Sequence, residues 1–354
     1  MVGPEGLLVG GGPDPRVLRA LSTPLIGQFD PAFTAIMDEV TELGRRAFQA
    51  ESARCVPVSG LAEAALEAVL NTLLEAADRV VAVGGIGERI ADVAERSGAS
   101  LEIVAADHLG ASLGRDAARL VVVEHVDART GTLQPLPEMA AVCHAHGALL
   151  LVDASLSLGG CELRFDAWRL DAAVAGLEGC LGGAAGLSLT VFSAQMEAAF
   201  LARAKPPTTS YLDLLQLAAY WSPERLNHHT APTSLVYAAR EALRLALVEG
   251  LEARWARHQQ IASRLRAGLS ALGLTLRGEA GSIICVLDPP EGELMQLLRD
   301  EYGIVSGARG QIALVGENAR LETLLVVLAS LEQALIALGR AVTPGAARSA
   351  ALAA

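Results

Sequence analysis

The chemistry open to this 354-residue chain is limited first by its lysine count. Its 28 basic residues are 27 arginines and one lysine, Lys205, so any chemistry that needs a lysine must use that residue. Two glycine clusters, at 10–12 and 84–87, follow apolar runs and suggest phosphate loops. Neither completes G-x-G-x-x-G or G-x-x-x-x-G-K, which favours tight turns at both places.

The histidines and cysteines lack the spacing of a metal or redox site. His144 and His146 are two residues apart at the end of a predicted helix, where their side chains point in different directions. The five cysteines are odd in number and include no C-x-x-C pair, which indicates reduced and mostly buried thiols. The pair His228-His229, in a loop that ends in proline, is less simply explained.

Composition indicates a folded, negatively charged protein. Hydrophobic residues make up 52% and charged residues 19%, which excludes a disordered or low-complexity chain. The net charge of −12 repels polyphosphate backbones, so we expect neither nucleic acid nor an anionic membrane as a partner. No apolar stretch reaches the ~18 residues that span a bilayer, and the N-terminus lacks the basic segment of a signal peptide. We therefore expect a cytoplasmic protein.

The elements that must position any site alternate between helix and strand. Apolar residues at helical spacing over 33–47 precede a short apolar run at 55–58. Similar runs, separated by amphipathic segments, predict further strands at 80–83, 101–104, 120–125, 148–153, 172–175 and 187–192. This alternation predicts an α/β fold with a mostly parallel central sheet and helices on both faces.

The pattern changes after Pro232 to long helices with two strand-like runs, at 282–287 and 311–315. This pattern of helices and strands predicts a smaller α+β domain that follows the large one. We place the large domain at residues 1–240, the small C-terminal domain at 241–340, and a flexible, Ala/Ser/Gly-rich tail at 341–354.

The strand at 148–153 and the turn after it point to a family. Residues 152–160 read V-D-A-S-L-S-L-G-G and resemble the V-D-A-x-x-S-x-G-G segment of class V aminotransferases, which are fold-type I enzymes dependent on pyridoxal phosphate (PLP). Within that family the chain most resembles the alanine–glyoxylate and serine–pyruvate aminotransferases, from about residue 7 to about residue 338. Other motifs that carry the resemblance are P-L-I-G at 24–27, S-Y-L-D at 210–213, H-H-T-A-P at 228–232 and G-E-N-A-R at 316–320.

The resemblance implies four cofactor-binding positions in this chain. Asp153 matches the aspartate that keeps the PLP ring nitrogen protonated, although a buried aspartate that caps the next turn is the structural alternative. Ser59 and Gly60 match the phosphate cup at a helix N-terminus. Thr230 matches the threonine that reaches the phosphate of the partner subunit, so the resemblance also implies a homodimer.

Other cofactor positions depart from the family pattern. Residues 175–182 read A-G-L-E-G-C-L-G where the family has S-G-S-Q-K-C-L-G, so Gly179 stands at the position of the Schiff-base lysine. Glycine cannot form an imine, and Lys205 matches an ordinary basic position instead. The segment 84–89 lacks the ring-stacking aromatic, and Glu63 brings a carboxylate to the phosphate turn.

Positions that serve the substrate also differ. Ala128 and Arg129 replace two hydroxyl residues, and Asn227 replaces a tyrosine. Gln311 replaces the arginine that binds the substrate carboxylate, and glutamine cannot form that charged bidentate pair. We therefore predict a degenerate cofactor site with no catalytic residue, no metal and no covalent PLP.

The sequence leaves two functions open. The first is a pseudoenzyme that serves as a binding or regulatory subunit, as a homodimer or as a heterodimer with an active paralogue. The second is an enzyme: an alanine/serine–glyoxylate/pyruvate type PLP-dependent aminotransferase, or a repurposed pocket with a non-lysine mechanism built on Asp153, Glu178, His125 and Arg129.

Overall fold

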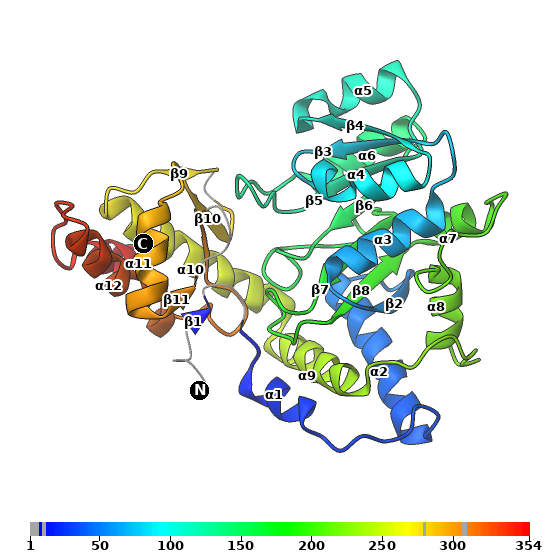
Figure 1. Ribbon diagram of the computed structural model, residues 1–354, viewed down its shortest axis with the longest axis horizontal. Helices are drawn as coiled ribbons and strands as arrows, with labels where there is room; N and C mark the ends of the chain where they lie inside the picture. The colour runs from blue at the N-terminus through cyan, green and yellow to red at the C-terminus, as the bar shows by residue number, and fades with distance from the viewer. Residues whose placement is uncertain (1–6, 9–11, 279–280, 306–309) are drawn as a thin grey trace.

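The computed structural model describes residues 7–8, 12–278, 281–305 and 310–354. These residues form two cores, one around a seven-stranded sheet and one around a three-stranded sheet (Figure 1). Gly10 and Gly11 of the first predicted glycine turn lie outside the described residues. Within those ranges no helix combines the length and the apolar character needed to cross a membrane.

The large sheet contains seven strands: β2 (Arg54–Ser59), β3 (Arg79–Val83), β4 (Ser100–Val104), β5 (Leu120–Glu124), β6 (Leu149–Asp153), β7 (Ala172–Gly176) and β8 (Leu187–Phe192). Their order is β2-β8-β7-β6-β5-β3-β4, and only β8 runs antiparallel to its neighbours. β5, β6 and β7 are buried at every position. Because successive side chains point to opposite faces, both faces are covered. The predicted α/β fold with a mostly parallel sheet is therefore confirmed.

Helices of the large core pack against this sheet and one another. They are α2 (Pro31–Phe48), α3 (Ala62–Leu73), α4 (Ile86–Arg96), α5 (Leu109–Arg115), α6 (Leu136–Ala145), α7 (Ala194–Leu201), α8 (Leu214–Trp221) and α9 (Thr233–Glu249), with a short 3-10 turn η1 (Ala106–His108). The N-cap of α2 is Asp30, whose carboxylate accepts a 2.8 Å hydrogen bond from the N–H of Ala32. A Cβ on Gly44 of α2 would lie 2.7 Å from Cys55 Sγ, so this glycine permits close packing of α2 on β2.

The small core follows Gly250, whose positive φ of 89° separates α9 from α10. Its elements are α10 (Leu251–Ala271), β9 (Leu276–Arg277), β10 (Ile284–Leu287), α11 (Gly292–Tyr302), β12 (Gln311–Ala313), α12 (Leu321–Ala337) and α13 (Ala346–Ala353). The three strands form an antiparallel sheet in the order β12-β10-β9. From the N-terminal part, β1 (Leu7–Leu8) pairs in parallel with β11 (Ile304–Val305), and α1 (Pro15–Leu21) packs on α9.

The C-terminal segment differs from the flexible tail that its composition predicted. Residues 346–353 form α13, and Ala347 and Ala351 are fully buried in the small core. Glu332 of α12 accepts the N–H of Gly345 with both carboxylate oxygens, each at 2.9 Å, just before α13 begins. Alanines four residues apart present a flat face, and a Cβ on Gly268 of α10 would lie 3.2 Å from the Ala347 carbonyl oxygen. Small residues on both helices therefore let α13 dock closely.

Candidate active site

A cleft of about 280 Å³ opens at the carboxyl ends of β5, β6 and β7, the edge at which α/β sheets bind ligands. Most of its polar lining is acidic. Four carboxylates line it, together with the guanidinium of Arg89: Glu63, Glu124, Asp153 and Glu178. Among the described residues that line the cleft, Arg89 is the only cation, so the cleft carries a surplus of negative charge.

Asp153 lies at the end of β6 and is almost fully buried. Its Oδ1 accepts a 2.9 Å hydrogen bond from the N–H of Ser155 and another from the Ser155 hydroxyl. Its Oδ2 accepts a 2.6 Å hydrogen bond from Nη1 of Arg89. Asp153 thus caps the following turn, as the structural alternative predicted, and also faces the cleft.

Arg89 stands in the first turns of α4 and connects three acidic residues. Nη1 also donates to Glu124 at 2.9 Å, and Nη2 donates to Glu63 at 2.8 Å. Burial by itself lowers the pKa of the Arg89 guanidinium, but the adjacent Asp153 carboxylate and its hydrogen bond outweigh burial and leave that pKa raised. Arg89 is therefore a permanent positive charge against the end of the sheet.

Glu124 and Glu178 are less well compensated. Burial raises the pKa of both carboxyl groups, and neighbouring carboxylates add to the rise. Glu178 Oε2 is buried and has no hydrogen-bond partner. The Glu178 side chain also folds back along the chain, because a Cβ on Gly176 would lie 2.5 Å from its Oε1. These two groups give the cleft acids that are protonated more readily than exposed glutamates.

Gly179, in the turn after β7, packs directly on the backbone of Ser155. A Cβ built on Gly179 would lie 2.6 Å from the Ser155 carbonyl oxygen, a separation that real side chains do not adopt. The Gly179 carbonyl also accepts a 3.0 Å hydrogen bond from the N–H of Gly182, which closes the turn. A side chain at position 179 therefore requires the backbone at 155 or 179 to move.

The single lysine of the chain lies elsewhere. Lys205 lines a separate cavity of about 440 Å³ with Arg203 and Glu75, and its backbone N–H donates to Glu75 at 3.2 Å. The residues that line the cleft at Asp153 include no lysine. The amine needed for an imine is therefore not supplied to this cleft by Lys205.

Of the four predicted cofactor-binding residues, Asp153 lines the cleft. Ser59 is the last residue of β2 and Gly60 follows it, just before Ala62 and Glu63, which also line the cleft. The Gly60 N–H donates to the Gly186 carbonyl at 2.9 Å. Thr230 is exposed in the loop between α8 and α9. The cofactor roles of Ser59, Gly60 and Thr230 stay predictions.

Residues proposed for a repurposed pocket are divided in the same way. Glu178 lines the cleft, but His125 is buried behind it, with Nδ1 2.9 Å from the Ser157 hydroxyl and a pKa lowered to about 4 by burial. Arg129 pairs with Glu88 at 2.9 Å and is not part of the lining. Gln311 reaches the cleft but donates its amide to the Ala128 carbonyl.

The main residue that sequence reasoning missed is Arg89. The motifs give it no role beyond ending the segment 84–89, although a basic residue in the first turn of a helix is an available signal, because it stands against the helix dipole. Such a residue needs carboxylates nearby, and the strands β5 and β6 both end in one.

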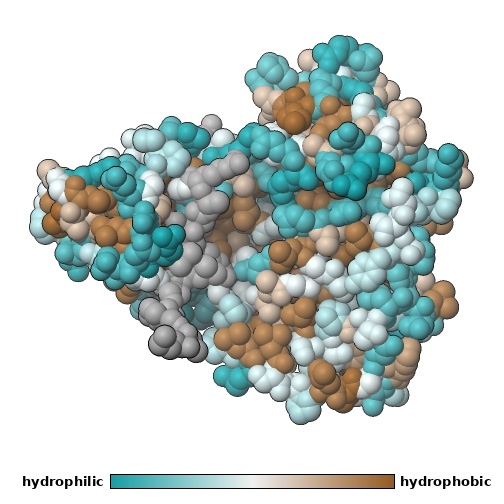
Figure 2. Space-filling view, viewed as in Figure 1, coloured by the Kyte–Doolittle hydropathy of each residue, from teal (hydrophilic) through white to brown (hydrophobic). Residues whose placement is uncertain are grey.

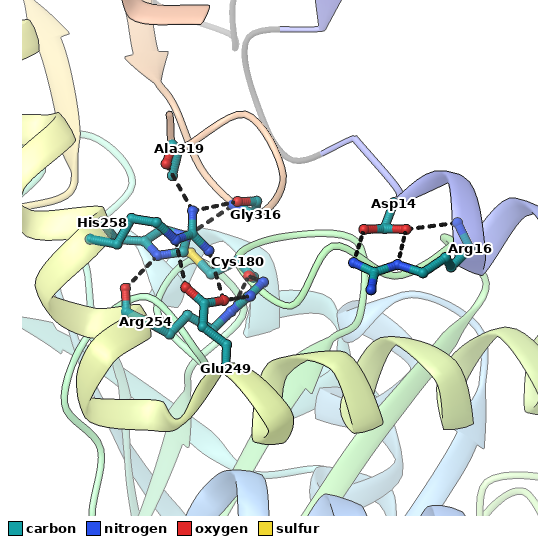
Figure 3. Close-up of polar contacts among 9 residues, drawn as sticks. Asp14, Arg16, Cys180, Glu249, Arg254, His258, Gly316 and Ala319 are labelled. Carbon is teal, nitrogen blue, oxygen red and sulfur yellow. Dashed lines mark hydrogen bonds and ion pairs between the residues drawn. The ribbon is translucent and has the colours of Figure 1, made fainter. Parts of the chain in front are cut away.

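A second polar group, the clasp (Glu249, Arg254, Arg257, His258 and Gly316), lies where the two cores meet (Figure 3). Arg254 donates to the Cys180 carbonyl through Nη2 at 2.6 Å and Nε at 3.2 Å. Because a carbonyl can only accept, Nδ1 of His258 donates to the Arg254 carbonyl at 2.8 Å, which leaves Nε2 to accept from the Gly316 N–H at 2.9 Å.

The clasp holds helix α10 to both sides of the junction. Burial lowers the pKa of His258 to about 3, so its ring stays neutral and keeps this tautomer. Arg257 donates to the Gly316 and Ala319 carbonyls, at 3.1 and 2.8 Å. Figure 3 also shows the separate pair Asp14–Arg16, which lines a cavity of about 220 Å³ beside the clasp. The turn that contains Gly179 is thus fixed by the clasp on one side and Ser155 on the other.

Comparison with known proteins agrees with this architecture. The sequence profile of the family described as Aminotransferase class-V matches residues 23–318. The (S)-ureidoglycine–glyoxylate transaminase of Bacillus subtilis is 34% identical over 96% of this chain and 92% of its own. The alanine–glyoxylate aminotransferase of Oryctolagus cuniculus is 32% identical over 94% and 93%. The crystal structure of the Bacillus subtilis ureidoglycine–glyoxylate aminotransferase superposes with a TM-score of 0.93, covering 100% of this chain and 98% of that one. The chain therefore belongs to the class V aminotransferases, a PLP-dependent family.

Proposed function

We propose that the chain is a non-catalytic member of its family, a binding or regulatory subunit whose cofactor site is degenerate. The observation that carries the proposal is the backbone contact at Gly179, where a lysine side chain has no room beside the Ser155 carbonyl. The only lysine, Lys205, lines another cavity. The residues of the cleft therefore do not fit covalently held PLP, and we assign no catalytic step to them.

The polar surroundings support the same proposal. Glu63 stands in the first turn of α3, where its carboxylate opposes a phosphate group at that helix N-terminus. Gln311 uses its amide on a backbone carbonyl rather than leaving it free for a substrate carboxylate. Each change weakens a different part of PLP transamination.

A second candidate is an active PLP-dependent aminotransferase of the alanine/serine–glyoxylate/pyruvate or ureidoglycine–glyoxylate type. It is favoured by the similarity to transaminases of both names over more than nine-tenths of the chain. Such an enzyme would need an amine from outside the cleft, or a backbone rearrangement at Gly179.

The experiment that separates the two candidates uses the purified chain with excess PLP. We expect no aldimine absorbance that borohydride abolishes, beyond what Lys205 and the N-terminal amine can form. The variant Lys205→Arg contains no lysine and is the matched control, because any label lost with it belongs to Lys205 outside the cleft. PLP-dependent amino-group transfer from alanine to glyoxylate, by the wild type and by Lys205→Arg, would establish the active enzyme instead.

For the assembly we propose a homodimer with an obligate interface above ~2,000 Å². Large apolar side chains are exposed on one part of the large core, including Leu25 at 68% and Phe29 at 61%. Figure 2 shows apolar residues gathered over α1 and α9, near this segment. Sedimentation at micromolar concentration should show a dimer, and a stable folded monomer would contradict the proposal.

Heterodimer formation with an active paralogue extends this assembly. Thr230 is exposed in the loop before α9, and the rings of Tyr211, His228 and His229 pack on one another beside it. Thr230 would complete the phosphate cup of the active partner. Co-expression with a tagged active homologue should recover mixed dimers, and Thr230→Ala in this chain should reduce the activity of the mixed dimer. Recovery of homodimers alone would contradict the heterodimer and leave the homodimer as the proposed assembly.

A further inference from the structure

The cleft at the ends of β5, β6 and β7 combines a surplus of negative charge with apolar walls. Its volume of about 280 Å³ suits a ligand of about one ring. Part of the lining is apolar and comes from α3 and from the segments after β5 and β6: Ala62, Val126, Ala128 and Leu156. The acidic part is Glu63, Glu124, Asp153 and Glu178. A ligand with an apolar body and a charged group would therefore meet both kinds of lining.

The one cation of the described lining does not balance these carboxylates. Arg89 pairs with Glu63, Glu124 and Asp153, at 2.8, 2.9 and 2.6 Å, but not with Glu178. The buried Oε2 of Glu178 has no hydrogen-bond partner. A carboxylate oxygen can accept more than one hydrogen bond, so Oδ2 of Asp153 can take a further donor beside Arg89. The described lining therefore leaves negative charge and acceptor capacity for a donor from outside the chain.

The carboxylates of the cleft also act on one another. Burial raises the pKa of the Glu178 carboxyl group, and the charges of Glu63 and Asp153 raise that pKa further. A positive charge among these three groups would relieve their repulsion, whereas an anion would add to it. A metal ion is a poor fit, because among the residues that the structure describes no three His, Cys, Asp or Glu side chains are grouped to hold one. The missing charge is therefore better supplied by an organic cation.

We propose that the cleft binds a small organic cation: an ammonium or amidinium group on an apolar body, with no anionic group. The inference rests on the proposed function and deepens it by naming the ligand class of the binding subunit. The cationic group lies among Glu63, Asp153 and Glu178, where its N–H groups donate to carboxylate oxygens. The apolar body lies against Val126 and Leu156. The ligand is bound without reaction.

The same lining disfavours amino acids and 2-oxo acids. Each of these carries a carboxylate, which binds best to a cationic or free amide donor. The Gln311 amide already donates to the Ala128 carbonyl, and Arg89 is held by three carboxylates of the cleft. A ligand carboxylate would therefore lie among like charges. Charge thus separates the proposed ligand class from amino acids.

The test titrates the full chain, without PLP, with three related probes by isothermal titration calorimetry at pH 8. Benzylamine carries a positive charge, benzyl alcohol carries none, and phenylglycine adds a carboxylate to benzylamine. Benzylamine should bind one site per chain with a dissociation constant in the millimolar range or below. The other two probes should bind at least about tenfold more weakly. Equal affinity for benzylamine and either of the others, or no saturable binding of benzylamine, would overturn the proposal.

Variants locate the bound cation. Glu63→Gln and Glu178→Gln each remove one charge from the lining, and each should weaken benzylamine binding about tenfold. Glu67→Gln removes the same charge from an exposed position one turn further along α3, so this matched control should leave the affinity unchanged. Equal losses in Glu63→Gln and Glu67→Gln would show attraction by the net charge of −12 rather than a site, and would overturn the proposal. If Glu178→Gln does not fold, the pair on α3 still decides.

Failure of this inference is distinguishable from failure of the proposed function. The titrations contain no PLP, whereas the proposed function is tested by PLP-dependent amino-group transfer. Such transfer, by the wild type and by Lys205→Arg, would overturn the proposed function whatever the titrations show. Absence of transfer, together with benzylamine that binds no better than benzyl alcohol, would overturn only the ligand class.

Discussion

The cleft and the clasp both hold the turn at 177–182, but they use charge differently. In the clasp, Arg254 is 6% exposed and each of its three nitrogens has an acceptor, the Cys180 carbonyl or the Glu249 carboxylate. In the cleft, one arginine, Arg89, serves three carboxylates, while Glu178 Oε2 has no partner. The clasp therefore has the satisfied hydrogen bonds of a structural network, whereas the cleft keeps a polar atom without a partner, as a binding site can.

This difference indicates that the clasp, rather than the cleft, stabilises the turn at 177–182. Charges in the clasp satisfy backbone carbonyls that would otherwise be buried without donors, so removing them should mainly affect stability. Surplus charge in the cleft opposes folding and persists only where a cation offsets part of it. Variants in the two regions should therefore differ in size and in pH dependence.

The largest effect should come from Arg254→Ala in the clasp. The change removes both donors of the Cys180 carbonyl and empties the space of a buried side chain, while Glu249 keeps Arg257; together this should cost about 3–5 kcal/mol of unfolding free energy. Denaturant unfolding measures the loss. The control is Arg244→Ala, because Arg244 makes a partly exposed pair with Glu241 on α9 and its removal should cause little change. Similar losses of unfolding free energy in the two variants would mean that the clasp contributes no more to stability than a surface ion pair.

The next largest effect should come from position 179, where the two regions meet. Gly179→Ala should lower the unfolding free energy by about 1–3 kcal/mol, because its Cβ would lie 2.6 Å from the Ser155 carbonyl oxygen. Gly27→Ala is the control, since no atom lies within 4 Å of a Cβ there.

Gly179→Lys should be at least as destabilised as Gly179→Ala and should not transaminate. Gln311 donates its amide to the Ala128 carbonyl and Glu63 stands in the first turn of α3, so we expect the added amine to meet no working site. Assays with alanine and glyoxylate measure this directly. Turnover by Gly179→Lys would show that the cleft is far more intact than its contacts indicate.

A smaller effect should appear in the pH dependence of the clasp. His258 has a pKa near 3 in the folded state and an ordinary value near 6.5 when unfolded. Its contribution is complete above pH 6.5 and falls as the pH drops toward 3, by up to about 1.4 kcal/mol per pH unit. Between pH 6.5 and 5, His258 takes up about one proton on unfolding, so His258→Gln should reduce the slope of unfolding free energy against pH by that proton. His125→Gln should reduce the slope by one proton more. An unchanged slope in both variants would show that neither histidine is neutral when folded.

The smallest effect should come from Glu178 in the cleft, with the opposite sign. Because burial raises the folded-state pKa of Glu178, its charged form opposes folding, and stability is lost as the pH rises above its ordinary range. Glu178→Gln should therefore raise stability slightly at pH 8 and leave it unchanged near pH 4. Glu293→Gln, at an exposed position of α11, is the control and should show a smaller difference between the two pH values.

Much of the fold could be predicted from local sequence. Apolar runs such as that ending at Asp153 become β5, β6 and β7 because a strand covered on both faces needs apolar residues at every position. The position of Asp153 at a strand end followed from the same pattern. The helix α13 could not be predicted from composition, because its alanines gain stability only by docking on α10 and α12.

The candidate site was predictable only in part. Sequence likeness directed attention to Gly179 and Asp153, but it did not reveal the contact between Asp153 and Arg89, which are 64 positions apart. Nor does the sequence show that the backbone at Ser155 fills the space beside Gly179. Such contacts depend on how strands and loops pack, which spacing along the chain does not specify.

The sequence by itself determined the family, the parallel sheet and the presence of a single lysine, because motifs, apolar periodicity and residue counts are properties of the chain alone. Only the tertiary structure decided that this lysine lies away from the cleft, and that Arg89 meets Asp153 and Glu124 there. The reason is physical: the strength of an ion pair and the room for a side chain depend on distances and burial, and the fold alone sets both.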